Sequence, residues 1–277
     1  MDRGAGRIVK LWVLGSGSGG NAILVECEGA RLLFDCGFGT RTLGHRLRSI
    51  DVAPESIDAC LLTHEHHDHS RGAVAASRRW GWGIYATPGT AISRELRRTT
   101  VQRFTPGVSL DFPRMVVETT AVPHDAIQPV GFVVTSRATG ARAGLFYDMG
   151  RITRAIAESC TALDILVLES NHDDQMLRVG PYPPSVQARI AGRYGHLSNR
   201  RAGQFACETA TRRLRHLVLA HLSEQCNTEH VALTSMKRAL TKSRFAGTLT
   251  AAKQDVVLGP FVPGAMRAEQ PVQYSLF

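Results

Sequence analysis

The segment LLTHEHHDHS, residues 61–70, carries four histidines and two acids at the six consecutive positions 64 to 69. Its first two residues are the last two of the apolar run IDACLL, residues 57–62. Burying so many ionisable side chains without partners would cost a large desolvation free energy. Neutral imidazole and carboxylate together bind divalent first-row metal ions well. The segment therefore predicts a metal site. The alternative, a histidine-rich surface loop, does not explain the apolar run before it.

The spacing T-H-x-H-x-D-H divides these side chains between two ions. Alternate side chains point the same way on a loop that follows a strand, so His64 and His66 can share one ion. Asp68 and His69 lie beyond the turn and can face a second ion. His67 fills a variable position, where we expect an outer-shell or exposed side chain. Two ions about 3.5–4 Å apart can share a water and produce hydroxide at neutral pH.

Apolar strands and helical stretches alternate along most of the chain. Strands are predicted at 7–14, 22–27, 30–37, 57–63, 83–87, 115–122, 130–136, 143–148, 163–170, 216–223 and within 248–258. Helices are predicted at 40–50, 71–80, 88–98, 151–160, 184–192, 199–215 and 228–240. Runs of strands with helices between the runs favour two packed sheets covered by helices.

The composition indicates a globular chain with a basic surface. Its 277 residues are 43% apolar, without an N-terminal signal peptide or a run of about 18 apolar residues that could span a membrane. The six cysteines form no C-x-x-C pair, which favours a reducing compartment and a cytoplasmic protein. The net charge of +9 comes mostly from arginine, which favours polyanions such as nucleic acid. A codon bias toward arginine would produce the same count.

The T-H-x-H-x-D-H motif resembles that of the metallo-β-lactamase fold superfamily. The resemblance implies an α/β fold, the αββα sandwich of two mixed sheets covered by helices, with two divalent ions, Zn²⁺ or Mn²⁺. It also implies three later ligands, each after an apolar run. His124 would complete the first ion, with Asp125 as the alternative. Asp148 would bridge both ions, and His221 would complete the second. Asp35 resembles an early aspartate that supports the metal loop, although a simple turn residue is an equal alternative.

Further stretches resemble the WalJ/YycJ-like branch of DNA exonucleases. They are GSGSGGN, PHDAIQPVGF, LESNHD, GPYP, GHLSN and HLSEQCN, and the resemblance covers nearly all of residues 10–258. It implies a binuclear phosphodiesterase acting on DNA, with Asp68 catalytic as well as metal-binding. The alternatives are an RNA nuclease with the same machinery, a thioester or lactone hydrolase, and a non-catalytic DNA-binding module. The intact ligand set argues against the last.

The stretch GHLSN also resembles a G-H-S-T segment of tRNA 3′-processing relatives. There a histidine, assisted by a glutamate, protonates the leaving oxygen, so the resemblance implies His196 as general acid and Glu169 as its partner. The alternative is a helix start, with Ser198 or Asn199 as N-cap. Substrate contacts are expected from His172, Ser198, Asn199, Arg200 and Arg201.

The composition changes after Gly259, where three prolines and no periodicity predict a flexible tail, 259–277, behind a catalytic domain, 1–258. The last five residues resemble the peptide Q-L-S/D-L-F with which bacterial proteins dock on the β sliding clamp. They are Gln273, Tyr274, Ser275, Leu276 and Phe277, with Tyr274 in place of the usual leucine. The resemblance implies the clamp as a partner; a chance match is the alternative.

Overall fold

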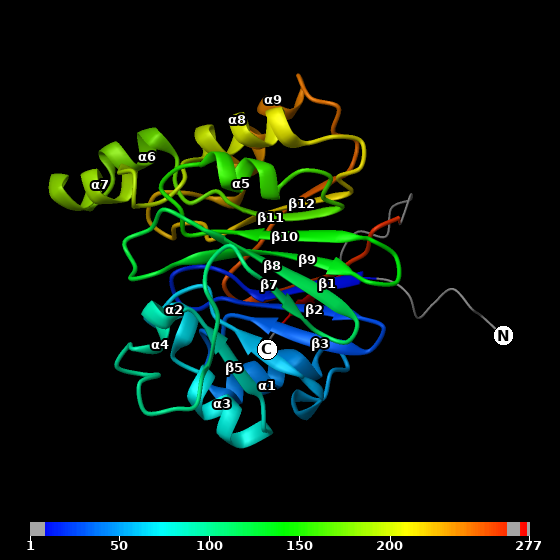
Figure 1. The fold of residues 1–277 in the computed structure, drawn as a ribbon. Coiled ribbons are helices and arrows are strands. Elements are labelled where there is room, and N and C mark those ends of the chain that lie inside the picture. The colour runs from blue at the N-terminus through cyan, green and yellow to red at the C-terminus, as the bar shows by residue number, and fades with distance from the viewer. Residues whose placement is uncertain (1–8, 265–271, 276–277) are drawn as a thin grey trace.

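Two β-sheets packed face to face form the centre of the structure, a computed structural model that describes residues 9–264 and 272–275 (Figure 1). Within these residues one sheet has the strand order β15 (Val272–Ser275), β14 (Val256–Phe261), β1 (Val9–Gly15), β2 (Ala22–Cys27), β3 (Ala30–Phe34), β4 (Ala59–Leu61), β5 (Gly83–Ala86) and β6 (Gln102–Arg103). The other has the order β13 (Thr248–Ala251), β12 (His216–Ala220), β11 (Ile165–Glu169), β10 (Arg142–Phe146), β9 (Val130–Ser136), β8 (Met115–Ala121) and β7 (Ser109–Asp111).

Both sheets mix parallel and antiparallel neighbours, and helices cover their outer faces. In the first sheet β1 and β2 are antiparallel and β3 and β4 are parallel. In the second sheet β8 and β9 are antiparallel and β11 and β12 are parallel. Helices α1 (Thr40–Arg48) and α3 (Ala73–Trp80) pack on the first sheet, and α5 (Arg154–Ser159), α8 (Asn199–Thr209) and α9 (Glu229–Leu240) on the second (Figure 1). The predicted αββα sandwich is confirmed.

Shorter helices lie toward one end of the sandwich, at the left in Figure 1: α2 (His67–Ser70), α4 (Pro88–Ala91), α6 (Asp174–Val179) and α7 (Pro184–Ala191). A single 3₁₀ turn, η1 (Pro54–Ser56), precedes β4 in the described chain. None of the helices in the described ranges combines the length and the apolar character needed to cross a membrane.

Period-two alternation along the strands separates three hydrophobic layers. In β1, Leu11 and Val13 point into the core between the sheets, whereas Trp12 and Leu14 point to the layer under α1 and α3. Across the central core, the rings of Phe34 and Phe132 lie 5.1 Å apart between centroids, one from each sheet. Because β11 and β12 are apolar on both faces, they bury side chains in the core and under the helices.

Parallel pairing brings the ends of several strands to one edge. β10, β11 and β12 are mutually parallel neighbours, so Asp148, Glu169 and His221 all follow or close strands at the same sheet edge. β4 of the other sheet ends just before His64. The fold therefore gathers at one edge side chains that are more than 150 residues apart in the chain.

Some elements differ from the predictions. The helix expected at 88–98 is only α4, because after Ala91 Leu96 is the one buried apolar side chain before Thr99, too few to anchor another turn. The helix expected at 199–215 ends at Thr209. The last predicted strand, within 248–258, is two strands in different sheets, β13 and β14.

The segment expected to be a flexible tail contributes to the first sheet. β14 crosses the predicted boundary at Gly259 and ends at Phe261, which is buried in the central core. The backbone of β15 pairs antiparallel with β14, with Gln273 opposite Leu258. Burial of the apolar side chain of Phe261 in the core favours continuation of the strand beyond Gly259. Leu276 and Phe277 of the predicted clamp motif lie outside the described residues.

Candidate metal centre

The histidine-rich segment spans the loop after β4 and the short helix α2, and most of its side chains are buried or half-buried. His64 and His69 are each 1% exposed, although both can ionise. His66 and Asp68 are half-buried, and His67 is exposed. The loop thus directs four of its five His and Asp side chains toward the interior, as the motif predicts, and turns His67 outward.

One triad of imidazoles lies on the side of the loop nearest β8. Metal-binding atoms of His64, His66 and His124 all lie within 4.8 Å of one another. His124 follows β8, and its Nε2 is 3.3 Å from Nδ1 of His66. Asp125, the alternative ligand, is outside the triad, and its carboxylate is 3.1 Å from the guanidinium of Arg189. The geometry thus favours His124 over Asp125.

A second triad contains Asp68, His69 and His221, also within 4.8 Å. Asp148 lies against the imidazoles of both triads. Its carboxylate oxygens are 2.9 Å from Nε2 of His69, 3.1 Å from Nδ1 of His221 and 3.9 Å from Nε2 of His124. One buried carboxylate therefore faces both groups of ligands, in the position expected of a bridging residue.

The hydrogen-bonding state of these atoms fits a metal ion. His64 Nε2, Asp148 Oδ2 and His221 Nδ1 are buried without a hydrogen-bond partner, even though Asp148 and His221 approach closely enough for an ion pair. Their contacts are short but misdirected for hydrogen bonds, and unpaired buried polar atoms are costly. Burial, followed by the charge on His69, lowers the pKa of His64 well below its ordinary value, which keeps a lone pair free for a cation. The cluster is therefore suited to a divalent metal ion.

Asp35 supports the metal loop from behind, at the end of β3. Its carboxylate is 2.7 Å from Nδ1 of His69, and it accepts hydrogen bonds from the backbone and hydroxyl of Thr63. The hydroxyl of Tyr147 donates to it over 2.8 Å. Fixing Nδ1 of His69 leaves Nε2 to face Asp68 and Asp148. The supporting role expected of Asp35 fits these contacts; the contribution of Tyr147 escaped the sequence analysis.

Three of the strand ends at the site have left-handed backbone conformations. Asp35, Asp148 and His221 have φ angles of 60°, 54° and 53°. Non-glycine residues seldom adopt this region, and such strain concentrates at functional sites. The turn it produces points each side chain back across the sheet edge.

The glycine-rich loop after β1 fixes the other side of the second triad. Asn21 donates from Nδ2 to Oδ2 of Asp68 over 3.2 Å, and the hydroxyl of Ser16 accepts the backbone N–H of His221 over 2.9 Å. Gly37 packs against this loop, where a Cβ would lie 1.8 Å from the carbonyl oxygen of Asp68. The sequence analysis noted the stretch GSGSGGN but assigned no role to Ser16 or Asn21 within it.

His196 and Glu169 form a dyad beside the metal ligands. Nδ1 of His196 is 2.7 Å from Oε1 of Glu169 and 3.3 Å from Oδ1 of Asp148. The other oxygen of Glu169 accepts the backbone N–H groups of Met149 and Leu197, which fixes the carboxylate. Burial lowers the pKa of His196, but Glu169 and Asp148 outweigh it and raise the pKa to about 10. With Nδ1 held, Nε2 is left to act on another group.

The expected substrate residues have different surroundings. Ser198 is the N-cap of α8, accepting the backbone N–H of Arg201, and Asn199 is buried among Ser170 and Asn227. The helix N-cap expected at Ser198 is thus present beside the His196–Glu169 dyad, and substrate contact by Ser198 or Asn199 stays a prediction.

The other three residues expected to contact substrate, His172, Arg200 and Arg201, lie in different surroundings. His172 is 1% exposed, and its imidazole is 3.4 Å from the side-chain oxygen of Asn171. Arg200 is exposed and forms an ion pair of 2.9 Å with Asp174. Arg201 donates to the carbonyl of Gly150, two residues after Asp148. Among the three, Arg201 alone is tied to the backbone next to a candidate ligand.

Comparison with known proteins points to one family. A model described as a beta-lactamase superfamily domain matches residues 30–222. Exodeoxyribonuclease WalJ of Streptococcus pneumoniae is 30% identical over 243 residues, covering 84% of this chain and 89% of the relative. Exodeoxyribonuclease YycJ of Bacillus anthracis is 30% identical over 238 residues, with the same coverage. The metallo-beta-lactamase fold protein YhfI of Bacillus subtilis superposes with a TM-score of 0.67 at 19% identity, over 92% of this chain and 98% of that one, and so is similar in fold.

Proposed function

This chain belongs to the beta-lactamase superfamily and, within it, to the branch of the WalJ and YycJ exodeoxyribonucleases. We propose that it is a metal-dependent phosphodiesterase that removes nucleotides from an end of DNA. The observation that carries the proposal is the meeting of two ligand triads at Asp148, directly beside the His196–Glu169 dyad. A hydrolytic centre for phosphodiesters needs both parts, because the attacking water must be activated and the departing sugar oxygen must receive a proton.

The number and kind of ions are part of the proposal. We expect two divalent ions, Zn²⁺ or Mn²⁺. His64, His66 and His124 would hold one ion and Asp68, His69 and His221 the other, and Asp148 lies against both groups of ligands. When bound, such ions supply hydroxide at neutral pH and neutralise charge on a phosphoryl oxygen. Mixed imidazole and carboxylate ligands suit Zn²⁺ and are compatible with Mn²⁺.

The chain's own residues carry the remaining steps. Asp68 is accessible enough to contact the reacting phosphoryl group, since 24% of its side chain is exposed. Glu169 fixes Nδ1 of His196, so that Nε2 can hold the proton that passes to the leaving oxygen. Asp35 orients His69 through its other ring nitrogen. Each of these roles places a defined atom before reaction begins.

DNA is the substrate that the relatives' names and the charge favour. The net charge of +9 attracts a polyanion. The test is a single assay with purified, metal-loaded protein on end-labelled single- and double-stranded DNA and RNA, beside a thioester panel. Stepwise loss of terminal nucleotides from DNA supports the proposal. Preferential cleavage of RNA, or turnover of thioesters alone, would contradict it.

Docking on the β sliding clamp remains a proposal about the C-terminal residues. Gln273, Tyr274 and Ser275 pair through their backbone with β14, so clamp binding would require β15 to leave the sheet edge. An added strand at a sheet edge is an exchangeable contact, since its main-chain bonds can be replaced by those of another partner. We further propose a cytoplasmic location, which the six free cysteines support.

A further inference from the structure

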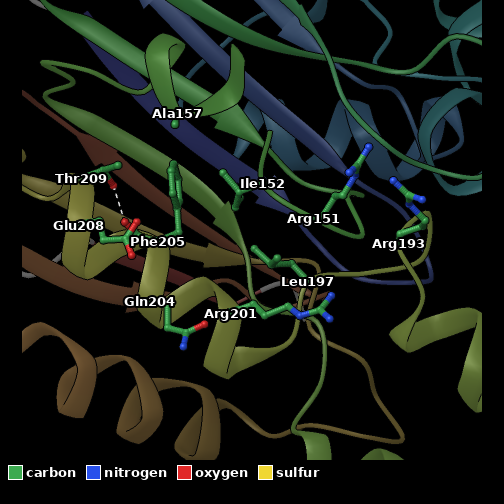
Figure 2. Close-up of a pocket in the computed structure, with 10 residues that line it drawn as sticks. All are labelled: Arg151, Ile152, Ala157, Arg193, Leu197, Arg201, Gln204, Phe205, Glu208 and Thr209. Atoms are coloured by element: carbon green, nitrogen blue, oxygen red, sulfur yellow. Dashed lines mark hydrogen bonds between the residues drawn. The ribbon is translucent and has the colours of Figure 1, made fainter. Parts of the chain in front are cut away.

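A pocket beside the metal centre lies between α5 and α8 and has a volume of about 390 Å³. Figure 2 shows Arg151, Arg193 and Arg201 on one side of it and Glu208 on the other, with Ile152 between them. Other apolar side chains, including those of Leu197 and Phe205, line its interior. The pocket is therefore cationic at one end, apolar in the middle and polar at the far end.

The cationic end adjoins the proposed reaction site through the chain itself. Leu197 follows His196, and Arg151 lies three residues after Asp148, at most about 11 Å along an extended chain. Arg201 donates to the carbonyl of Gly150 over 3.0 Å, which fixes its guanidinium next to this loop. A ligand whose phosphate reaches the metal centre can therefore place its next group in the pocket.

The positive charges of the arginines at this end are not neutralised by carboxylates in the described chain. Within the described residues, Arg151, Arg193 and Arg201 form no ion pair with a carboxylate, whereas the neighbouring Arg200 pairs with Asp174. Arg193 also lies over the ring of Tyr194, with 5.8 Å between its guanidinium carbon and the ring centroid. Three guanidinium groups without a carboxylate partner in the described chain line this end of the pocket, and an arginine can bind a phosphate through paired N–H donors.

We propose that this pocket binds a nucleotide adjacent to the scissile phosphodiester, a proposal that rests on the function proposed above. Its phosphate contacts Arg151, Arg193 and Arg201, and its base packs on Ile152 and the apolar wall. The side chains at the far end supply hydrogen-bonding groups for a base edge. The pocket thus holds the strand in register while its terminal nucleotide is removed.

The arginine contribution is tested by binding and by its salt dependence. The probe is a fluorescent single-stranded oligonucleotide with phosphorothioate linkages, which resist hydrolysis, on the metal-loaded protein. Arg151→Ala combined with Arg193→Ala should weaken binding about 10- to 100-fold, the usual loss for one or two charge-assisted bonds. It should also reduce the slope of log affinity against log salt by about 0.7, the contribution of one neutralised phosphate on a single strand. Metal content and thermal midpoint verify that the variant is folded.

Arg154→Ala is the matched control, because Arg154 lies on α5 beside the pocket, does not line it, and pairs with Glu158 at 2.6 Å. It should leave affinity and salt slope near those of the wild type. An unchanged affinity and slope in the double variant, with DNA binding intact in the wild type, would overturn the pocket proposal alone. Absence of DNA binding and cleavage in the wild type would instead overturn the proposed function.

The base-binding part has its own readout. Abasic nucleotides placed at successive positions of the oligonucleotide should reveal one position, near the end, where losing the base weakens wild-type binding about 10-fold, the order expected for one stacked base. Ile152→Ala should reduce that difference. A uniform response at every position would show that no base enters the pocket and would contradict this part of the proposal.

Discussion

Asp148 meets imidazoles from four segments of the chain, at distances of 2.9 Å to His69, 3.1 Å to His221, 3.3 Å to His196 and 3.9 Å to His124. The neighbouring carboxylate of Glu169 is committed to His196 and to two backbone N–H groups. At the residue scale, the site thus assigns the carboxylates of Asp148 and Asp68 to ion binding and those of Glu169 and Asp35 to orientation. This division separates residues whose loss removes metal from residues whose loss spares it.

His196→Ala belongs to the second group. We expect the variant to keep its metal and to cleave ordinary phosphodiesters about 10²- to 10⁴-fold more slowly, the usual contribution of general acid catalysis. A nitrophenyl phosphodiester should be affected far less, because its leaving group needs no proton. His67→Ala is the control, since that histidine is exposed on the same loop. Equal losses on both substrates would argue against proton donation.

Tyr147→Phe tests the support behind the metal loop. The variant loses the 2.8 Å hydrogen bond to Asp35 without changing the shape of the side chain. Because the bond is buried, we expect the free energy of unfolding to fall by about 1 kcal/mol in urea denaturation. Tyr85→Phe is the comparison, since no hydrogen bond of the Tyr85 hydroxyl is present within the described residues. Equal stability of the two variants would show that Asp35 does not depend on Tyr147.

At the element scale, the site consists of strand ends. Apolar runs predicted the strands, and the family resemblance implied Asp148 and His221 as ligands after two of them. The structure brings both to one edge because β10, β11 and β12 are parallel. Asn21 and Tyr147 could not be predicted in the same way. Tyr147 reaches Asp35 across 112 positions, and a single Tyr or Asn carries no spacing that reveals its partner.

The start of a helix shows a second limit of prediction from sequence. The stretch GHLSN was open to two interpretations, a general acid at His196 or a helix start capped by Ser198 or Asn199, and the structure contains both the dyad and the Ser198 cap. A Ser before a helix has the same local sequence in either case. The left-handed backbone at Asp35 and His221 was not predicted either, since Asp and His adopt this region more often than most residues but only in a small fraction of cases.

Glu26 in β2 provides a pH-dependent test of the first sheet. Burial raises the pKa of this carboxyl, but its bonds with Lys10 and Arg31, at 3.0 and 2.7 Å, outweigh burial and lower the pKa overall. A carboxyl with a lowered folded-state pKa stabilises the protein above the unfolded pKa, and that contribution is lost as the pH falls through the folded value. Glu26→Gln should therefore be less stable than the wild type at pH 7. The difference in thermal midpoint should shrink at pH values below the unfolded pKa; a constant difference would contradict the assignment.

At the scale of the whole molecule, the net charge and the C-terminal residues both bear on how the protein reaches DNA. Many arginines are paired with carboxylates, such as Arg213 with Asp164 and Arg142 with Glu118, so the net charge of +9 overstates what a strand can contact. The unpaired guanidinium groups beside the metal centre are the more specific feature. Sequence composition predicted the sign of the surface but could not identify which arginines remain free.

The C-terminal strand sets a prediction for recruitment. The full-length protein should bind a β sliding clamp with a dissociation constant in the micromolar range, about −8 kcal/mol, because the segment must leave β14 and be ordered again on the clamp. Deletion of residues 273–277 should abolish that binding. Cleavage of short free DNA should survive, because the deleted segment contains no candidate ligand. Equal clamp binding by both proteins, measured by surface plasmon resonance, would refute the docking proposal.

The central claim is that a metal centre shared through Asp148 hydrolyses DNA from an end. The most direct measurement follows release of nucleotides from end-labelled DNA, with metal per chain counted on the same samples. We expect two ions per chain, loss of activity on chelation and its return with Mn²⁺ or Zn²⁺. Asp148→Ala should bind less metal and remain inactive after metal is restored, whereas Asp125→Ala should keep both. Full nuclease activity and two ions per chain in Asp148→Ala would contradict the account.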